Sequence, residues 1–241
     1  KNGSDCSMTR RTRLIAALDT QSRDQAAAWV SAFGSDVDAI KLGLEFTHSC
    51  GFDAVKTVSA GRTLFLDLKL HDIPNTVAHG LKSLAHVQPA LTTIHAAGGT
   101  EMISRAKEAL QEAFPDALRR PKLLAVTVLT SMDAAGLSEI GVSASPQEQV
   151  LRLGKLAIRA GADGLVCSAK EIAPLRDTLG DVPELVVPGI RPAGSASDDQ
   201  NRIMTPTEAA QAGAAWIYVV QPITRAATPV PASRAILEEL D

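Results

Sequence analysis

Short apolar runs alternate along the chain with longer segments whose apolar residues recur at helical spacing. Each run has the length of a β-strand. Eight runs are predicted as strands: Leu14–Leu18, Ala39–Leu44, Thr63–Leu68, Leu91–His95, Leu123–Leu129, Gly164–Cys167, Leu185–Ile190 and Trp216–Val220. The segments between them are predicted as helices: Gln25–Phe33, Phe52–Ala60, Pro74–His86, Glu101–Ala113, Gln147–Ala160, Glu171–Leu179, Thr207–Ala212 and Pro231–Leu240. Strict alternation of strand and helix implies a parallel sheet.

The number of strand–helix units decides between the two common parallel architectures. About eight units in 241 residues favour a closed (β/α)8 TIM barrel, because an open doubly wound sheet usually has fewer strands. Residues 14–241 are predicted to form one barrel domain, and residues 1–13 an N-terminal extension with Met8 as a candidate native start. The long connectors Thr130–Ser145 and Pro192–Thr205 are candidate lids.

Composition narrows the classes of function. Hydrophobic residues make up 45% of the chain and aromatic residues only 3%, so the predicted core is aliphatic. The net charge of −3 argues against a basic surface for nucleic acid, and the few aromatics argue against a base-stacking platform. The three widely spaced cysteines, Cys6, Cys50 and Cys167, are not a disulfide framework, which favours a reducing cytoplasm. No apolar run approaches the roughly 20 residues that span a bilayer, so no membrane segment is expected.

Active sites of such barrels lie at the carboxyl-terminal ends of the strands. The polar residues predicted there are Asp19, Lys41, Asp67, Lys69, His95, Thr127, Thr130, Ser168, Arg191 and Gln221. Polarity resumes at the end of any strand, so a single position has a structural explanation as well. The set favours a functional site, because several of its members interrupt otherwise apolar runs.

The third run places two opposite charges on one face of its strand. Side chains alternate along a strand, so Asp67 and Lys69 point into the barrel while the neighbouring leucines face the helices. Charges there are costly unless paired, and Lys41 offers a second ammonium from the next strand. A structural ion pair is one interpretation. The other is chemical: a lysine between carboxylates can act as a general acid, and a carboxylate beside a substrate carboxylate favours loss of carbon dioxide. Such chemistry needs no metal and no cofactor.

Several strings carry a resemblance to a known family. The string DLKLHDIPNT at positions 67–76 resembles the signature of orotidine 5′-monophosphate decarboxylases of the bacterial type. Further strings follow in the family's order: ALD at 17–19, IKLGLE at 40–45, IHAAGG at 94–99, VTVLTS at 126–131, VPGIRP at 187–192 and DQ at 199–200. The resemblance implies a homodimeric, cofactor-free enzyme that converts orotidine 5′-monophosphate to uridine 5′-monophosphate and carbon dioxide in pyrimidine biosynthesis.

The same resemblance implies roles for the charged residues. Lys69 matches the proton donor to the carbanion left on the pyrimidine ring. Asp67 matches the aspartate beside the substrate carboxylate. Lys41 belongs to the charged network, and with Asp19 it matches the residues that bind the ribose hydroxyls. Asp72 matches an aspartate that is lent across the dimer interface to the partner's site.

The remaining matches are substrate contacts. Thr76 accompanies the lent aspartate across the interface, and Ile73 is a further substrate-binding candidate. Thr130 matches a contact to the pyrimidine. Gln200 matches a lid residue that bridges the base and the phosphate, and Arg191 lies at the root of that lid.

The chain departs from the family at the end of the eighth strand. The family has Gly-Arg before Pro-Ile-Thr, whereas Val220 and Gln221 stand at these positions here. The glycine lets the backbone approach the substrate phosphate and the arginine pairs with it, so phosphate binding is expected to be weaker. Arg225 is a candidate to compensate from the next turn.

Two other functions stay open. Related barrel enzymes share an Asp-x-Lys-x-x-Asp arrangement and some bind magnesium, so one alternative is a magnesium-dependent decarboxylase or aldolase of sugar phosphates. His71 and His95 beside Asp67 are its candidate ligands, although His71 also fits a packing role. The second alternative is a protein that binds the nucleotide but turns it over poorly because of Val220 and Gln221.

Overall fold

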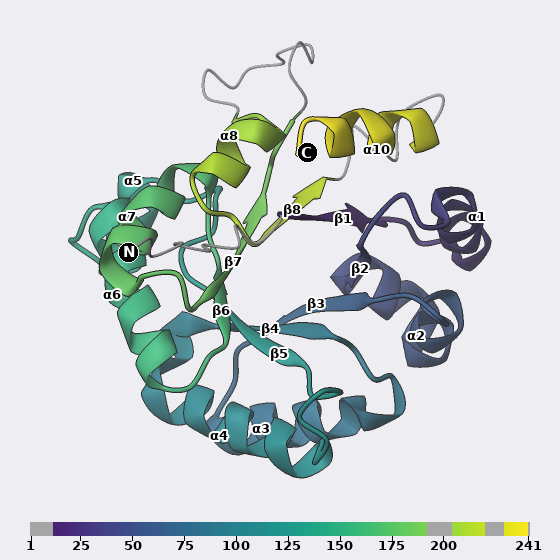
Figure 1. Cartoon of the computed structure of the whole chain (residues 1–241). Helices are drawn as coiled ribbons and strands as arrows, with labels where there is room; N and C mark the ends of the chain where they lie inside the picture. Colours follow the sequence, from purple (N-terminus) through teal and green to yellow (C-terminus); the bar gives the residue numbers. More distant parts are fainter. Residues whose placement is uncertain (1–11, 192–203, 220–228, 241) are drawn as a thin grey trace, which may run out of the picture.

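The computed structural model describes residues 12–191, 204–219 and 229–240. Eight parallel strands close into a barrel in the order β1 to β8, with β8 pairing back onto β1 (Figure 1). The strands are β1 (Arg13–Ala17), β2 (Ala39–Gly43), β3 (Leu64–Leu70), β4 (Leu91–His95), β5 (Lys122–Val126), β6 (Gly164–Val166), β7 (Glu184–Pro188) and β8 (Trp216–Val219). The predicted (β/α)8 barrel is confirmed, and each predicted strand overlaps its observed counterpart.

Helices surround the barrel in Figure 1. They are α1 (Arg23–Phe33), α2 (Leu44–Val58), α3 (Pro74–Lys82), α4 (Gly99–Ala113), α5 (Ala134–Glu139), α6 (Pro146–Arg159), α7 (Ile172–Leu179), α8 (Pro206–Gln211) and α10 (Pro229–Glu238). Three short 3₁₀ turns, η1 (Ser83–His86), η2 (Ala96–Gly98) and η3 (Ala169–Glu171), adjoin α3, α4 and α7. These helices correspond to the helical parts of the predicted strand–helix units.

Two helices differ from the sequence-based expectation. Helix α2 begins at Leu44, well before the predicted start at Phe52. Gly51 interrupts its helical backbone with a φ of 79°, which breaks the apolar periodicity on which the prediction rested. Helix α5 lies inside Thr130–Ser145, which was predicted as a connector. Its first turn is capped by Asp133, a local signal too short to register as a periodic segment.

Two hydrophobic cores lie on either side of the barrel wall. Inside the barrel are Ile15, Ala39, Phe65, Leu91, Leu124, Val126, Val166, Val186, Ala215 and Trp216, with Tyr218 packed against them. A larger aliphatic cluster fills the space between the strands and the helices, and it includes Leu66 and Ile94. Alternate residues of one strand therefore serve different cores, as the period of two requires.

Strand β3 becomes irregular where it approaches the end of the barrel. Leu66 pairs with Thr92 and Leu70 with Ile94, so the step along β3 is longer than the step along β4. This β-bulge places Lys69 in the left-handed backbone region, with a φ of 49°. The bulge changes the direction in which the last side chains of β3 point.

Some expectations fall outside the described ranges. The predicted N-terminal extension lies almost wholly on residues 1–11, and most of the predicted lid Pro192–Thr205 lies on residues 192–203; both stay predictions. Among the helices that the structure describes, none combines the length and the apolar character needed to cross a membrane.

Candidate active site

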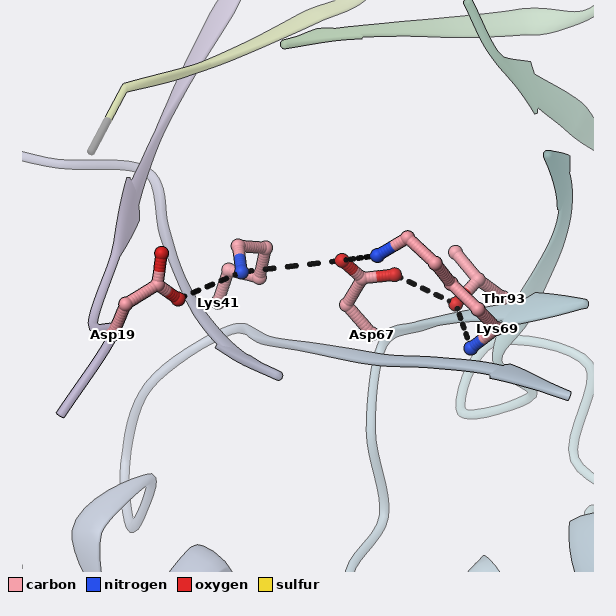
Figure 2. Close-up of polar contacts among 5 residues, drawn as sticks. All are labelled: Asp19, Lys41, Asp67, Lys69 and Thr93. Carbon is pink, nitrogen blue, oxygen red and sulfur yellow. Dashed lines mark hydrogen bonds and ion pairs between the residues drawn. The ribbon is translucent and has the colours of Figure 1, made fainter. Parts of the chain in front are cut away.

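Four alternating charges lie across the carboxyl-terminal end of the barrel, called the mouth below (Figure 2). Lys41 Nζ lies 3.1 Å from Asp19 Oδ1 and 3.9 Å from Asp67 Oδ2. Lys69 Nζ donates to the same Asp67 Oδ2 at 2.5 Å. The four side chains come from the ends of β1, β2 and β3, which are neighbours in the sheet. The structure thus brings together Asp19, Lys41, Asp67 and Lys69 as a single network.

A missing side chain makes room for the central ammonium. Gly43 pairs with Asp67 across β2 and β3. A Cβ atom at Gly43 would lie 3.2 Å from Lys41 Nζ, closer than an ordinary van der Waals contact. The glycine therefore leaves the space in which Lys41 reaches between Asp19 and Asp67.

The burial of Asp67 explains why two cations surround it. The residue is 3% exposed, and a carboxylate removed from water needs paired charges and hydrogen bonds. The two ammonium groups differ in access, because the Lys41 side chain is 7% exposed and that of Lys69 is 28% exposed. Lys69 is the ammonium of the network that a ligand at the mouth can reach.

Thr93 on β4 holds the other side of the carboxylate. Its Oγ1 donates to Asp67 Oδ1 at 2.8 Å and accepts from the Lys69 backbone N–H at 2.9 Å. Figure 2 shows both contacts, which connect the hydroxyl to the two residues of β3. Asp67 thus has partners on both of its oxygens.

A small pocket of about 80 Å³ opens beside the network. Its lining residues are Lys69, Val126, Val128, Leu129, Thr130, Val166, Cys167, Pro188 and Tyr218. Ligand pockets are usually about 300–1,000 Å³, so this one fits one end of a ligand rather than a whole nucleotide. Thr130, predicted as a pyrimidine contact, is exposed at this pocket.

Tyr218 lines the pocket, and its aromatic ring also lies beside the network. Its ring centroid lies 5.7 Å from Lys41 Nζ and 6.3 Å from the ring of Phe65. Burial raises the pKa of the phenol, and the carboxylates of Asp67 and Asp19 raise it further because they repel the phenolate. Tyr218 therefore keeps its hydroxyl proton near neutral pH.

Asp72 and its neighbours lie apart from the network within this chain. Asp72 is exposed, and its Oδ1 accepts from the backbone N–H of Ile73 at 2.7 Å. Ile73 is 66% exposed, and Thr76 is exposed in the first turn of α3. The three residues form an accessible edge of the mouth, and the structure of one chain does not join them to Lys69.

Other polar residues at strand ends have structural partners. Thr127 Oγ1 donates to the Val166 carbonyl at 3.2 Å. Ser168 forms a capping box with Glu171 at the start of η3, and burial raises the pKa of Glu171. His95 lies against His71, with ring centroids 5.5 Å apart. Burial lowers the pKa of His95, and the charges of His71 and Lys69 lower it further.

The predicted phosphate side of the site is described only at Arg191. Arg191 is half-buried, and its backbone N–H donates to the Met204 carbonyl at 3.3 Å. The remaining expectations on this side concern Gln200, Val220, Gln221 and Arg225, which lie outside the described residues.

Within residues 12–191, 204–219 and 229–240, no three or more His, Cys, Asp and Glu side chains gather in a way that could hold a metal ion. Burial raises the pKa of the Cys167 thiol well above its ordinary value, so this cysteine is an inert apolar side chain.

Sequence reasoning missed three residues of the site as contributors to its geometry. Thr93 lies two positions before His95 on the same strand face, so alternation pointed to it, but threonine is common in any strand. Tyr218 lies within the predicted strand Trp216–Val220, where nothing in the residue pattern assigns it to the site. Gly43 appeared only as part of a string, because the space it leaves depends on Lys41.

The chain matches one protein family over most of its length. Residues 12–236 match the Orotidine 5'-phosphate decarboxylase / HUMPS family. A curated Orotidine 5'-phosphate decarboxylase of Gluconobacter oxydans is 75% identical over 233 residues, which cover 97% of this chain and 99% of that protein. One of Opitutus terrae is 50% identical over 228 residues, covering 94% and 97%.

Solved structures give the same result for the fold. The crystal structure of Orotidine 5'-phosphate decarboxylase from Lactobacillus acidophilus is similar, with a TM-score of 0.84 and 40% identity, covering 96% of this chain and 99% of that one. The orotidine 5'-phosphate decarboxylase from Pyrococcus horikoshii has a TM-score of 0.76 and 21% identity, covering 94% and 98%. At that lower identity the likeness concerns the fold alone.

Proposed function

Because the chain belongs to the Orotidine 5'-phosphate decarboxylase / HUMPS family, we propose that it decarboxylates orotidine 5′-monophosphate to uridine 5′-monophosphate and carbon dioxide. The observation that carries this proposal is the buried Asp67 carboxylate between the ammonium groups of Lys41 and Lys69. The reaction is that of a carboxy-lyase in pyrimidine biosynthesis. We place it in the cytoplasm, where the free thiols of Cys50 and Cys167 stay reduced.

The network supplies each step of the reaction. The bond between the pyrimidine ring and the substrate carboxylate breaks, carbon dioxide leaves, and the electron pair stays on the ring carbon. Lys69 donates its proton to that carbon and recovers one from water. Asp67 beside the substrate carboxylate disfavours the ground state, and loss of carbon dioxide relieves the repulsion. Lys41 and Asp19 bind the ribose hydroxyls, and no step uses a metal or a cofactor.

A continuous absorbance assay of the orotate chromophore tests the proposed reaction. We expect absorbance to fall with saturation kinetics, and uridine 5′-monophosphate to appear in equal amount. No loss above background at millimolar substrate would overturn the proposal. Complete inhibition by a chelator, reversed by magnesium, would instead support the metal-dependent alternative.

Phosphate binding is proposed to be weakened by Val220 and Gln221. A charged hydrogen bond contributes about 1.5–3 kcal/mol, so the double change Val220→Gly with Gln221→Arg should lower KM by about tenfold to a few hundredfold. Turnover should rise as well, because binding energy from the remote phosphate contributes to the transition state. Unchanged KM and kcat in the double variant would show that this departure does not limit the enzyme.

We propose a homodimer in which Asp72 and Thr76 complete the partner's site, with Ile73 beside them. The proposal is supported by the exposure of all three residues beside the mouth and by the 66% exposure of the apolar Ile73. An exposed apolar side chain at the edge of a charged site fits a surface that a second copy covers.

Mixed dimers test whether the site is shared. Lys69→Ala and Asp72→Asn should each abolish most activity alone. Mixing the two after joint refolding should restore activity to about a quarter of the wild-type value, because half of the dimers are mixed and each has one intact site. If Asp72 served its own chain, mixing would restore nothing.

A further inference from the structure

We propose that Thr93 is a positioning residue that holds the Lys69 proton donor and the Asp67 carboxylate in their working arrangement. The inference rests on the proposed function and adds a residue to it. Thr93 is buried, so it does not itself reach the substrate. It acts through the backbone of Lys69 and through the side chain of Asp67.

The first observation is the backbone of Lys69. A lysine with a φ of 49° is in the left-handed region, which is unfavourable for a residue that carries a Cβ atom. Such a conformation persists only where the surroundings hold it. It occurs here inside the β-bulge of β3, where regular ladder pairing with β4 is interrupted. The Lys69 N–H donates instead to Thr93 Oγ1 at 2.9 Å.

The second observation is the direction of the two hydrogen bonds. A hydroxyl has one donor and can accept twice. Since the Lys69 N–H must donate, Thr93 Oγ1 accepts there and directs its own proton to Asp67 Oδ1, 2.8 Å away. That contact occupies one carboxylate oxygen and orients the other, Oδ2, toward the ammonium groups of Lys41 and Lys69. One hydroxyl therefore sets both the path of the chain at Lys69 and the rotation of the Asp67 carboxylate.

The third observation is burial. Thr93 is 0% exposed, so bulk water cannot replace its hydrogen bonds when the hydroxyl is removed. Without the hydroxyl, the Lys69 backbone can relax from its left-handed conformation and carry the ammonium away from Asp67. The expected loss is then in the chemical step, because a displacement of about 1 Å can lower a rate by about a hundredfold.

The neighbouring residue provides a matched control. Thr92 is also 0% exposed and lies on the opposite face of β4. In the described part of the chain, its Oγ1 has no hydrogen-bond partner. Replacing an unpaired buried hydroxyl with a methyl group is expected to be neutral or stabilising. Thr92→Val therefore reports the general effect of the same chemical change one residue away.

The experiment compares Thr93→Val, Thr93→Ser and Thr92→Val in steady-state decarboxylation, with thermal unfolding of each variant. We expect Thr93→Val to lower kcat by about tenfold to a hundredfold with KM changed by less than about threefold. Thr93→Ser keeps the hydroxyl and should restore most of kcat. Thr92→Val should match the wild type in both constants.

The outcomes separate the inference from the proposed function. If the wild type itself fails to decarboxylate, the proposed function is wrong. If the wild type is active and Thr93→Val retains its full kcat, the positioning role is wrong. Equal losses in Thr93→Val and Thr93→Ser would also overturn it, because the hydroxyl would not be the cause. Should Thr93→Val fail to fold, Thr93→Cys is the second variant, since a thiol of similar size is only a weak hydrogen-bonding group; full kcat in that variant overturns the inference.

Discussion

The two ends of the barrel each bury a carboxylate beside a cation. At the mouth, Asp67 is 3% exposed and Lys69 donates to it. At the amino-terminal end, Glu184 is 5% exposed and accepts from Arg13 Nη2 at 3.1 Å and from Trp216 Nε1 at 2.6 Å. The Arg13 guanidinium also lies 3.6 Å above the Trp216 ring. The two clusters are thus alike in burial and in charge.

They differ in what their cations can do. Arginine stays protonated in proteins and its planar group is held by stacking, so Arg13 can only bind. A lysine ammonium can give up its proton, so Lys69 can bind and can also act as an acid. The larger cavity, about 650 Å³, lies at the end of Arg13 and Glu184 and not beside Lys69. A lysine that can release its proton therefore indicates the site of the proposed reaction better than the volume of the nearest cavity does.

Replacing the two cations in the same way should separate their roles in catalysis. Lys69→Met removes the proton donor, so kcat should fall by about 10²–10⁴-fold. It also removes one of the two cations beside the buried Asp67, so the unfolding temperature should fall as well. Arg13→Met should leave kcat within about twofold and lower the unfolding temperature. Equal activity in Lys69→Met and the wild type would remove Lys69 from the mechanism. The orotate absorbance assay measures kcat, and calorimetry measures the unfolding temperature.

Replacing Glu184 tests how much the buried carboxylate at the amino-terminal end contributes to stability. Glu184→Leu leaves Trp216 Nε1 buried without this acceptor, so the free energy of unfolding should fall by about 2 kcal/mol. Glu184→Gln keeps an oxygen acceptor for the indole and should lose about half as much. Urea denaturation measures both values. A change in kcat without a change in stability would show that this end of the barrel takes part in the reaction.

Gly43→Ala tests the space around Lys41. The added Cβ would lie 3.2 Å from Lys41 Nζ, so the ammonium must shift by a few tenths of an ångström. We expect an activity loss of about tenfold, since larger displacements cost about a hundredfold. Gly80→Ala is the control, because its Cβ would meet only Leu70 Cδ1, at 3.9 Å. Equal effects in the two variants would contradict the prediction.

His95 gives the smallest effect, a dependence of stability on pH at the mouth. Burial, His71 and Lys69 lower its pKa in the folded state, while Asp67 opposes the shift. The unfolded chain then binds more protons once the pH falls below about 6.5, so the free energy of unfolding decreases there. His95→Asn should reduce this decrease between about pH 7.5 and about pH 5.5. Urea titrations at both pH values check it, and an unchanged difference counts against this origin.

Sequence reasoning succeeded where the physical rule is local. The strands were found because aliphatic runs recur with turn residues between them, and alternation correctly directed Asp67 and Lys69 into the barrel. The predicted direction of the Lys69 side chain is correct although its backbone leaves regular strand geometry. The reason is that Leu68 and Leu70 still pack against the outer core. The α2 prediction was wrong at its start because Gly51 interrupts the helix without ending it.

The parts that could not be predicted depend on contacts between distant residues. The link from Thr93 to Lys69 depends on how β4 lies beside a bulge, and no spacing in the chain encodes that bulge. The position of Tyr218 beside the network depends on the closure of β8 against β1. The role of Asp72 depends on a second copy of the chain and stays a prediction.

The pairing of β8 with β1 has a consequence for synthesis of the protein. Leu14 pairs with Ile217 and Ala16 with Val219. One edge of β1 therefore stays unpaired until nearly the whole chain has been synthesised. During translation, β1 can pair with β2 early, but its other edge stays open to other chains. Chaperone binding to nascent chains should therefore persist until β8 has left the ribosome.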